Sequence, residues 1–550
     1  MSLRADLTQA IATARDRAIA AGNLTVGPDT DLPPIGLERP AKPEHGDWAS
    51  NVAMQLAPLA RLAPMRIAEA ILGHFDRPPS IAETSIAAPG FLNIRLDAGW
   101  VASQVEPIRR AGVSYGRDTA TDRRRINVEF VSANPTGPLH VGNARGAFVG
   151  DVLSRVLAAV GHTVEREYYF NDFGAQVVNL GLSVLARRRG TDIPEDGYRG
   201  DYVAELADQL PVELLSEADA APDEAGRIVG AWATERVRAG IEASLERLGV
   251  HFDVWKEESS LHDGGWVGRA VEKLRQSGHV YEGEGATWFR STDFGDDKDR
   301  VIYRSNGKPT YFASDIGYVT EKLGRGFDEL IYIWGVDHHG TVARVRNAAE
   351  AMGHDREAVR MLLIAWVRFV RDGVEIPMSK RSGEFITLDD VLDEVGVDAA
   401  RWYFSSRAYT TGIDFDLELA KKQSNENPVY YVQYAHARAS SILRHAAEAG
   451  AAPDASRTGE LLRHPSEQGL LRHLLEFPDA LAVAAERRET HEVPRYCYEL
   501  ASAFSAFYRD CKVLSEDQAL SAARLALVDA TRSVLVNGLD LLGISAPDSM

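Results

Sequence analysis

Residues 125–170 read RINVEFVSANPTGPLHVGNARGAFVGDVLSRVLAAVGHTVEREYYF, and this stretch decides the fold. From Ile126 to Phe130 apolar and polar residues alternate, which predicts a strand, and NPTGP then ends it. Apolar residues recur at four-residue spacing from Phe148 to Val160, which predicts a helix ended by Gly161. TVEREYYF predicts a second strand. A strand, a helix and a strand in this order form a βαβ unit, the building block of a parallel, doubly wound sheet.

A second α/β stretch lies two hundred residues further along the chain. ELIYIW (329–334) predicts an apolar strand that ends in the loop GVDHHG, followed by a helix to about Met352. The apolar run MLLIAWVRFV (361–370) then leads into DGVEIPMSKRSG (372–383). In an open α/β sheet, ligands bind at the carboxyl ends of the strands where the strand order reverses. We therefore expect the loops of both stretches to meet across one crevice.

The chain of 550 residues is long enough for several domains. Residues 1–115 predict a small α+β module, with a Pro-rich break, a helical stretch near 49–75 and a strand at GFLNIRL. Residues 116–410 predict a Rossmann-like domain with an acidic insertion at about 177–305, and residues 411–550 predict an α-helical bundle. The predicted fold class is multidomain α/β, with a doubly wound parallel sheet between the N-terminal module and the bundle.

Charge and cysteine usage exclude several classes of protein. The formal net charge is −19, which argues against a general nucleic-acid binder, so a nucleic-acid partner would need local basic patches. Cys497 and Cys511 have no CxxC spacing, so neither a zinc site nor a disulfide framework is indicated. No apolar run is long enough for a membrane span, and the N-terminus lacks a signal-type segment, so a cytoplasmic location is expected.

The first candidate motif is Pro138-Leu139-His140-Val141-Gly142-Asn143, at the turn from the first strand into the helix. The first turn of a helix presents free N–H groups and the positive end of the helix dipole, which suits the phosphates of a nucleotide. Gly142 allows a close approach of the ligand to the backbone, and His140 can donate to a phosphoryl oxygen. Taken alone, the pattern fits an ordinary N-cap turn with a surface histidine equally well.

The second candidate motif is Met378-Ser379-Lys380-Arg381-Ser382-Gly383, in a polar loop. Lys380 can neutralise β and γ phosphates as charge develops on a leaving pyrophosphate. By itself the motif fits a solvated basic loop better. The two motifs occur in this order, about 240 residues apart and both at strand ends, and this arrangement favours phosphate-binding loops over a solvated loop.

The two motifs resemble the HIGH and KMSKS signatures of the class I aminoacyl-tRNA synthetases. Further segments make the chain similar to one family within that class, the arginyl-tRNA synthetases. They are spread over nearly the whole chain and comprise GDWASNVAMQLA, GFLNIRL, VEFVSANPTGPLHVGNARGA, FNDFGAQ, YRGDYV, the DHHG loop and LDLLGISAPDSM. The resemblance implies ATP-dependent activation of L-arginine as an adenylate and its transfer to the 3′-terminal ribose of a tRNA.

The resemblance also implies the residues of the nucleotide site. The catalytic set is His140, Asn143 and Lys380, and ATP is expected to contact Pro138, His140, Gly142, Asn143, Gly335, Asp337, His338, Met378, Ser379 and Lys380. Two positions depart from the family pattern: Asn143 replaces the last histidine of HIGH, and Pro377 replaces the first lysine of KMSKS. Mg²⁺ is expected to enter as Mg-ATP. No protein-held metal is expected, because the adjacent His338 and His339 point differently and no third ligand is spaced with them.

The arginine site follows from the same resemblance and from the chemistry of the guanidinium. That group is a planar fork of donors, which carboxylates bind through two hydrogen bonds. The expected arginine-binding residues are Glu129, Ser132, Asn134, His140, Tyr311 and Asp315. Without the resemblance, Glu129 fits a strand-edge carboxylate and Asp315 a helix-capping acid. A monomer that binds its tRNA before it activates arginine is also implied.

Three alternatives remain open from the sequence. A cysteinyl-tRNA synthetase would hold zinc in its pocket, and this chain lacks the thiols for it. A nucleotidylyltransferase with an HxGH turn would not require the N-terminal module or the helical bundle. A tRNA-binding regulatory paralogue would not need an intact His140 and Lys380. Aromatic residues of the bundle (Tyr430, Tyr431, Tyr434, Phe507 and Tyr508) suit stacking on anticodon bases, although we expect core packing for most of them.

Overall fold

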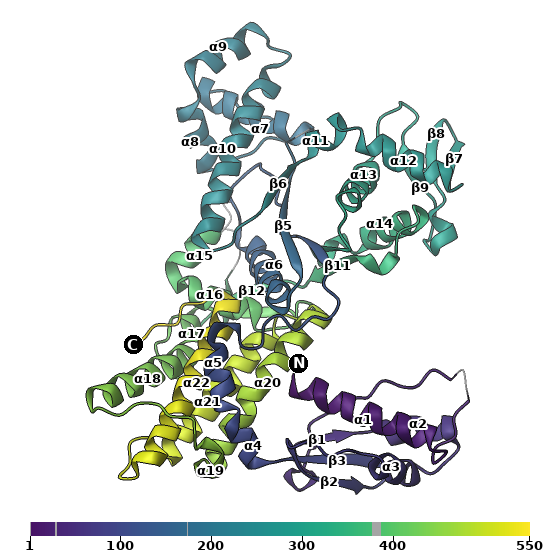
Figure 1. Ribbon diagram of the computed structural model, residues 1–550. Coiled ribbons are helices and arrows are strands. Elements are labelled where there is room, and N and C mark those ends of the chain that lie inside the picture. The colour runs from purple at the N-terminus through teal and green to yellow at the C-terminus, as the bar shows by residue number, and fades with distance from the viewer. Residues whose placement is uncertain (1, 28–29, 173, 377–386) are drawn as a thin grey trace.

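The computed structural model describes residues 2–27, 30–172, 174–376 and 387–550. An α/β region occupies the middle of the molecule, and a bundle of long helices and the N-terminal module lie side by side below it (Figure 1). The predicted multidomain α/β class is confirmed. In the described part of the chain no helix is both long and apolar enough to cross a bilayer.

The central sheet has five parallel strands in the order β11-β10-β4-β5-β6. The strands are β4 (Arg125–Glu129), β5 (Thr163–Phe170), β6 (Val254–Glu257), β10 (Glu329–Gly335) and β11 (Val359–Ile364). The chain enters at β4 in the centre, moves outward through β5 and β6, and returns to β10 and β11 on the other side. The strand order therefore reverses between β4 and β10, and this is the switch point where a ligand site is expected.

Helix α6 (Val141–Val160) connects β4 to β5, as the sequence predicts. It is buried on nearly every side, because it lies between the sheet and the C-terminal bundle. Gly161 ends it with φ 111°, a left-handed conformation that a residue with a Cβ rarely adopts. Because α6 follows β4 in the chain, the N-terminus of α6 lies at the carboxyl edge of the sheet.

Two units flank the sheet between β5 and β10 (Figure 1). One is a helical arm, formed by α7 (Ala175–Arg189), α8 (Asp201–Gln209), α9 (Val212–Ala220) and α10 (Ala225–Arg247). The other contains α11 (Glu258–Asp263), α12 (Trp266–Gln276), β7 (Val280–Gly283), β8 (Ala286–Phe289), η3 (Ser291–Phe294), β9 (Arg300–Tyr303) and α13 (Tyr311–Gly324). The edge strand β6 lies between the units, so the stretch expected as an insertion at about 177–305 includes one strand of the central sheet.

The apolar run at 361–370 is divided between two sheets. Its first part completes β11, and its second part forms β12 (Val367–Arg371), which pairs with β13 and β14. Between β10 and β11 the chain forms η4 (Val336–His338), α14 (His339–Ala351) and η5 (Arg356–Ala358). After β12 come β13 (Val374–Ile376), α15 (Leu388–Val395), α16 (Val397–Ser405), β14 (Ile413–Asp416) and α17 (Leu417–Lys421). Strand β13 therefore leads directly into residues 377–386.

The N-terminal module packs helices on a small antiparallel sheet of order β1-β3-β2. Its elements are α1 (Leu3–Ala20), η1 (Pro43–His45), β1 (Trp48–Ser50), α2 (Val52–Ala60), α3 (Pro64–Gly73), β2 (Ile81–Ala87) and β3 (Phe91–Leu96). The predicted strand at GFLNIRL is β3. The helical stretch expected near 49–75 is two helices, because Arg61 ends α2 in a left-handed conformation (φ 53°) and Pro64 begins α3.

The C-terminal bundle consists of α18 (Pro428–Glu448), α19 (Thr458–Leu461), α20 (Pro465–Arg487), α21 (Glu492–Asp510) and α22 (Gln518–Leu542). It is joined to the N-terminal module through α4 (Ala98–Ser103), α5 (Val105–Ala111) and η2 (Gly112–Ser114). Buried Arg401 of α16 binds the bundle to the sheet domain, because its guanidinium pairs with Asp151 of α6 and donates to the Leu542 carbonyl at 2.5 Å.

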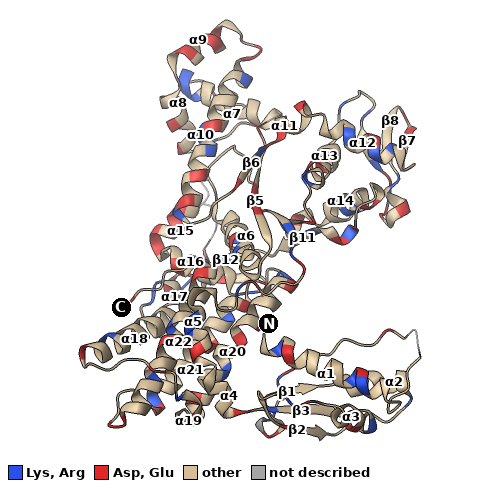
Figure 2. Cartoon of the chain, in the orientation of Figure 1, with Lys and Arg blue, Asp and Glu red and all other residues tan. Residues whose placement is uncertain are grey.

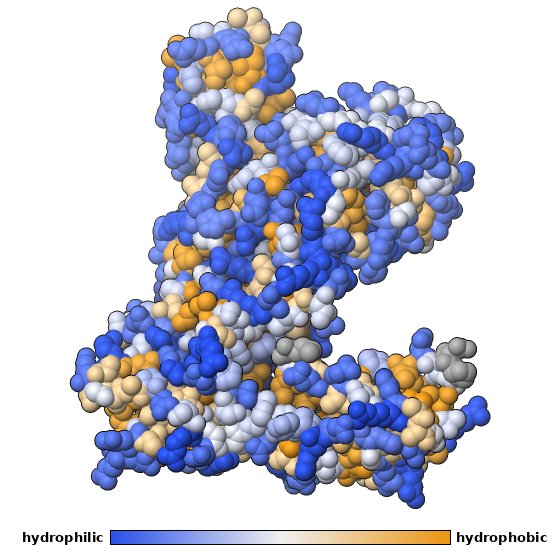
Figure 3. Space-filling view, in the orientation of Figure 1, coloured by the Kyte–Doolittle hydropathy of each residue, from blue (hydrophilic) through white to orange (hydrophobic). Residues whose placement is uncertain are grey.

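Acidic and basic residues are interspersed along all three parts of the chain (Figure 2). On the face shown in Figure 3, hydrophilic residues cover most of the central region. Among the bundle aromatics, Phe507 is buried, whereas Tyr430, Tyr431 and Tyr434 are half-buried and Tyr508 is 44% exposed. The expectation that most of these rings pack in the core is wrong, because the four tyrosines reach the surface of the bundle.

Candidate active site

A cavity of about 1420 Å³ lies at the carboxyl ends of β4 and β10, at the switch point of the sheet. Twelve of the residues singled out in the sequence line it. They are Glu129, Ser132, Asn134, Pro138, His140, Gly142, Asn143, Tyr311, Asp315, Gly335, Asp337 and His338. Residues from four separate segments of the chain therefore meet around one space.

The backbone turns sharply where β4 ends. Val131 and Ser132 both have positive φ, 67° and 40°, which is unusual for residues other than glycine and most unusual for a β-branched one. The turn brings the Ser132 hydroxyl to within 3.3 Å of Glu129 Oε1, and the same hydroxyl accepts from the Tyr169 amide at 3.1 Å. Strained backbone of this kind is concentrated at functional sites, and here it fixes the Glu129 carboxylate at the cavity wall.

The His140 turn also lines the cavity. The Asn143 side chain accepts from the His140 amide at 3.1 Å, so the residue that replaces the last histidine of the HIGH signature closes the first turn of α6. A Cβ on Gly142 would lie 2.8 Å from His140 Cε1, so the imidazole rests on backbone that only glycine leaves open. Burial lowers the pKa of His140, so its ring is neutral at pH 7.

Helix α13 supplies the acidic side of the cavity. Thr310 caps the helix by accepting from the Ala313 amide at 3.3 Å. Tyr311, which is 82% exposed, and Asp315 follow at a spacing of four residues and both line the cavity, so the predicted shared helical face is present. Burial and the neighbouring carboxylate of Glu129 raise the pKa of Asp315 to about 7. This carboxyl group is therefore poised to gain a cationic partner.

The loop after β10 closes the remaining side. Gly335 lies against Asp337, whose carboxylate oxygen would be 2.4 Å from a Cβ at that position. The Asp337 and His338 side chains are 80% and 59% exposed, and the His338 ring lies 5.8 Å from the Trp334 ring. The loop thus presents glycine backbone and two polar side chains to the cavity.

Met378, Ser379 and Lys380 of the second motif lie outside the described residues, as does Pro377. The chain re-enters the described structure at Thr387, which lines the cavity and forms a β-bridge with His140. Next to it, the Leu388 amide donates to the Leu139 carbonyl at 3.0 Å. The end of the second motif's loop is therefore attached to the first motif.

Several tyrosines of the cavity were not predicted. Tyr202 lines it from α8 and donates to the Thr136 carbonyl at 2.7 Å, and its neighbours Tyr198 and Arg199 line it too. The YRGDYV segment that contains them carries part of the family resemblance, and this was the available signal. Tyr169 and Tyr332 belong to apolar strands, where an aromatic residue cannot be distinguished from core by its pattern alone.

Comparison with known families covers most of the chain. The model "Arginyl tRNA synthetase N terminal domain" matches residues 1–96, "tRNA synthetases class I (R), catalytic domain" matches 104–192 and 223–406, and "DALR anticodon binding domain" matches 432–550. An arginine–tRNA ligase of Heliobacterium modesticaldum is 43% identical over 561 residues, covering 100% of this chain and 99% of the relative. One of Frankia alni is 46% identical over 553 residues, covering 99% and 100%.

Solved structures agree with these matches. Thermus thermophilus arginyl-tRNA synthetase superimposes with a TM-score of 0.80 at 26% identity and 100% coverage of both chains. A methionyl-tRNA synthetase of Mycobacterium tuberculosis gives a TM-score of 0.52 at 12% identity, covering 76% of this chain and 92% of that one, and shows a common fold alone. A doubly wound sheet with the His140 turn at its switch point defines the catalytic domain of a class I aminoacyl-tRNA synthetase. Within that class, the chain belongs to the arginyl-tRNA synthetase family.

Proposed function

We propose that this chain is an arginine–tRNA ligase that activates L-arginine with ATP and transfers it to the 3′-terminal ribose of its tRNA. One observation carries the proposal: Glu129 and Asp315 share a cavity at the switch point with the His140 turn. The cavity thus combines a helix N-terminus for phosphates with carboxylates for a cation.

ATP would bind along the first turn of α6. The helix N-terminus attracts the phosphates, and His140 donates to a phosphoryl oxygen from its neutral ring. Pro138, Gly142 and Asn143 shape this turn, while Gly335, Asp337 and His338 border the adenosine. On the family resemblance, Met378, Ser379 and Lys380 would contact the phosphates, with Lys380 neutralising the pyrophosphate. Mg²⁺ would enter on the phosphates of ATP, since this ion keeps several waters and is held through substrate phosphates more than by a protein cage.

Arginine would bind with its guanidinium on the α13 side. The carboxylate of Asp315 suits two parallel hydrogen bonds to the guanidinium, and the exposed Tyr311 covers it from one side. Glu129, Ser132 and Asn134 lie at the end of β4, where they suit the α-amino group and the backbone of the substrate. A lysine would leave the planar acceptor pair only partly satisfied, which supports discrimination without editing.

The chemistry then consists of two displacements. A carboxylate oxygen of arginine attacks the α-phosphorus in line, the bond to the bridging oxygen breaks, and pyrophosphate leaves. The 2′-hydroxyl of the terminal ribose next attacks the carbonyl carbon of the adenylate, and AMP leaves. Positioning and charge stabilisation supply the catalysis, so no covalent enzyme intermediate is needed.

The flanking parts would bind the tRNA. The match to an anticodon-binding domain supports this role for the helical bundle of residues 411–550, with the surface tyrosines available for stacking. Residues 1–115, which precede the catalytic residues 116–410 in the chain, would make a separate contact with the tRNA. On the family resemblance we also propose a cytoplasmic monomer whose arginine activation requires bound tRNA.

Charging of total tRNA with labelled arginine by the purified chain tests the proposal. We expect ATP-dependent transfer by the wild type and a loss of roughly a hundredfold or more in His140→Ala, because one donor to the developing charge is removed. Labelled cysteine offers the matched substrate control and should give no transfer. A wild-type chain that binds tRNA but does not charge it would instead support the regulatory paralogue.

A further inference from the structure

A fully buried lysine lies directly beneath the proposed arginine site. Lys322 belongs to α13, two helical turns after Asp315, and its side chain is 0% exposed. Its ammonium nitrogen lies 4.2 Å from the ring centroids of both Tyr318 and Tyr332. Burial of an ammonium group is unfavourable unless a negative charge compensates it, so we expect a compensating carboxylate next to Lys322.

The register of the sheet supplies this carboxylate. Glu129 of β4 pairs with Glu167 of β5 on one side and with Tyr332 of β10 on the other. Neighbouring residues in register point to the same face, so two buried carboxylates stand side by side, an arrangement that is unfavourable when both are charged. The Lys322 side chain of α13 contacts both carboxylates: its Nζ lies 2.6 Å from Glu129 Oε2 and 3.6 Å from Glu167 Oε1.

The two glutamates depend on Lys322 to different degrees. Glu167 is also bound by Asn127 Nδ2 at 3.0 Å, by the Arg325 guanidinium and by the Tyr318 hydroxyl. Burial raises the pKa of Glu167, but Lys322, Arg325 and Tyr318 together lower it to about 2. The Glu129 carboxylate accepts hydrogen bonds from the Lys322 ammonium and, at 3.3 Å, from the Ser132 hydroxyl. Lys322 is thus the cation that balances Glu129.

We propose that Lys322 is a positioning residue for arginine recognition, which holds the Glu129 carboxylate charged and oriented at the cavity wall without touching the substrate. The inference rests on the proposed function, since it assumes that Glu129 contacts arginine. It assigns a role to a residue that lies outside the cavity lining, and it explains why a lysine is buried there.

The surroundings determine what happens when the lysine charge is removed. The titratable and charged groups around it are Glu129 on β4; Glu165, Glu167 and Tyr169 on β5; Lys256 on β6; Glu258 on α11; Asp315, Tyr318, Glu321 and Arg325 on α13; and Tyr332 on β10. Burial already raises the pKa of Glu129 with Lys322 in place. Without the ammonium this pKa rises further, so Glu129 takes up a proton at a higher pH and no longer attracts the cationic substrate.

The test is the pH dependence of the KM for arginine in tRNA-supported ATP–pyrophosphate exchange by Lys322→Met. We expect the arginine KM to rise by about ten- to a hundredfold at neutral pH, because this factor corresponds to the free energy of one hydrogen bond to a charged group. The rise should shrink as the pH increases and Glu129 regains its charge, while the KM for ATP stays unchanged. Lys322→Arg should restore much of the loss at neutral pH.

Lys256→Met is the matched control, because that lysine pairs with Glu321 at 3.1 Å and lies outside the cavity lining. It should leave the arginine KM and its pH profile as in the wild type. A folded Lys322→Met enzyme whose arginine KM equals the wild-type value at every pH, or whose KM for ATP rises equally, overturns the proposal.

Glu129→Gln keeps the experiment decisive if Lys322→Met does not fold. This variant imitates the protonated carboxyl group, so its arginine KM should exceed the wild-type value at every pH, by a ratio that does not shrink as the pH rises. An unchanged arginine KM in Glu129→Gln contradicts the inference about Lys322. Absence of arginine-dependent exchange in the wild type contradicts the proposed function instead, so the two failures are distinguishable.

Discussion

Replacement of Asp315 by asparagine distinguishes the effect of this residue on the stability of the fold from its effect on the binding of arginine. The change preserves the size of the side chain and removes its charge. Asp315 lines the cavity near Glu129 and Glu258, and both of these carboxylates, together with burial, raise its pKa to about 7. The folded protein therefore disfavours the anionic form of the Asp315 carboxyl group.

The magnitude for arginine follows from the lost ion pair. Removal of one partner of a buried, hydrogen-bonded charge pair costs about 3–5 kcal/mol. At about 1.4 kcal/mol for each factor of ten, kcat/KM for arginine should fall by roughly two to four orders of magnitude. The KM for ATP should remain within about twofold, since Asp315 is assigned to the guanidinium and not to the phosphates.

The effect on stability has the opposite sign. A carboxyl group whose pKa is about 7 in the folded protein, against an ordinary value of 3.8, is neutral in both states at low pH and penalises the folded state once it ionises. The penalty grows as the pH rises from about 4 to 7 and is complete above that. Asp315→Asn should therefore raise the free energy of unfolding by about 2 kcal/mol at pH 8, after allowance for water in the cavity, and by little at pH 4.

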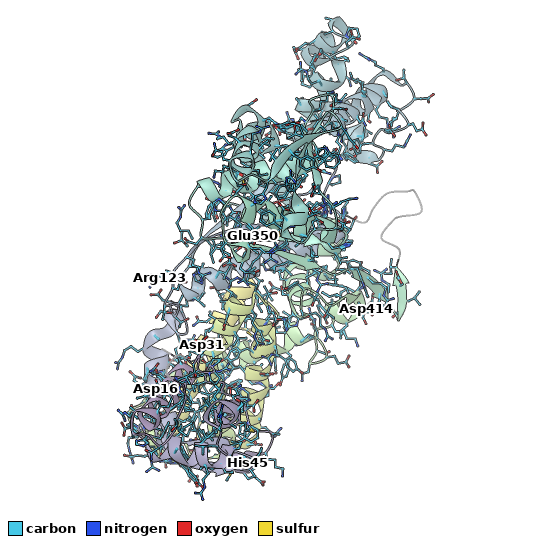
Figure 4. All side chains as sticks on the ribbon, turned by 90° about the vertical axis from the view of Figure 1, so that its right-hand side faces the viewer. Asp16, Asp31, His45, Arg123, Glu350 and Asp414 are labelled. Atoms are coloured by element: carbon cyan, nitrogen blue, oxygen red, sulfur yellow. The ribbon has the colours of Figure 1, made fainter. Side chains whose placement is uncertain are left out.

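The assay is exchange kinetics at saturating tRNA, together with urea unfolding at pH 4, 6 and 8. Asp414→Asn is the control, because Asp414 (Figure 4) lies on β14 in the small sheet and does not line the cavity, and its hydrogen bond with Arg368 lowers its pKa. That variant should lose stability above pH 4 and keep its arginine KM. If Asp315→Asn were less stable than the wild type at pH 8, or retained its kcat/KM for arginine, the reasoning would be refuted.

Three further variants test other parts of the account. Gly142→Ala places a Cβ 2.8 Å from the His140 ring, so exchange should slow by about tenfold or more while thermal stability holds or rises slightly with the better helix former; an undiminished rate would contradict the packing role of this glycine. Arg401→Met removes one of the two cations that bind buried Asp151, which keeps its ion pair with Arg155 at 2.8 Å, and should lower the free energy of unfolding by about 2–3 kcal/mol in urea titrations; a loss below 1 kcal/mol would argue against the Arg401–Asp151 pair as the link between bundle and sheet. Lys380→Ala should reduce kcat for exchange by roughly a hundredfold with little change in the arginine KM, and full aminoacylation activity would remove this lysine from its role.

The sequence predicted the elements whose periodicity is long and regular. Strands β4 and β5 and helix α6 follow directly from alternation and four-residue spacing, and the glycine at 161 ends the helix. Strand β6 was missed because it has four residues, Val254–Glu257, within an acidic helical region. The division of the apolar run after Met361 was missed because a continuous apolar run has no period that could show a change of sheet.

Twelve residues of the cavity lining were predicted from the motifs and the family resemblance, but the charge balance of the cavity could not be predicted. The partners Lys322 and Glu129 are 193 residues apart in the sequence, and nothing local distinguishes this lysine from a solvated one on a helix. The same holds for Tyr332, which reads as strand core. Pairings of this kind are decided by the register of the sheet and the placement of α13, so they become visible only in three dimensions.

The most direct test of the central claim is ATP–pyrophosphate exchange by the purified chain with each of the twenty amino acids, measured with and without total tRNA. The account predicts exchange with arginine alone, and only when tRNA is present. Exchange driven by a different amino acid, or none with arginine although tRNA is bound, would contradict it.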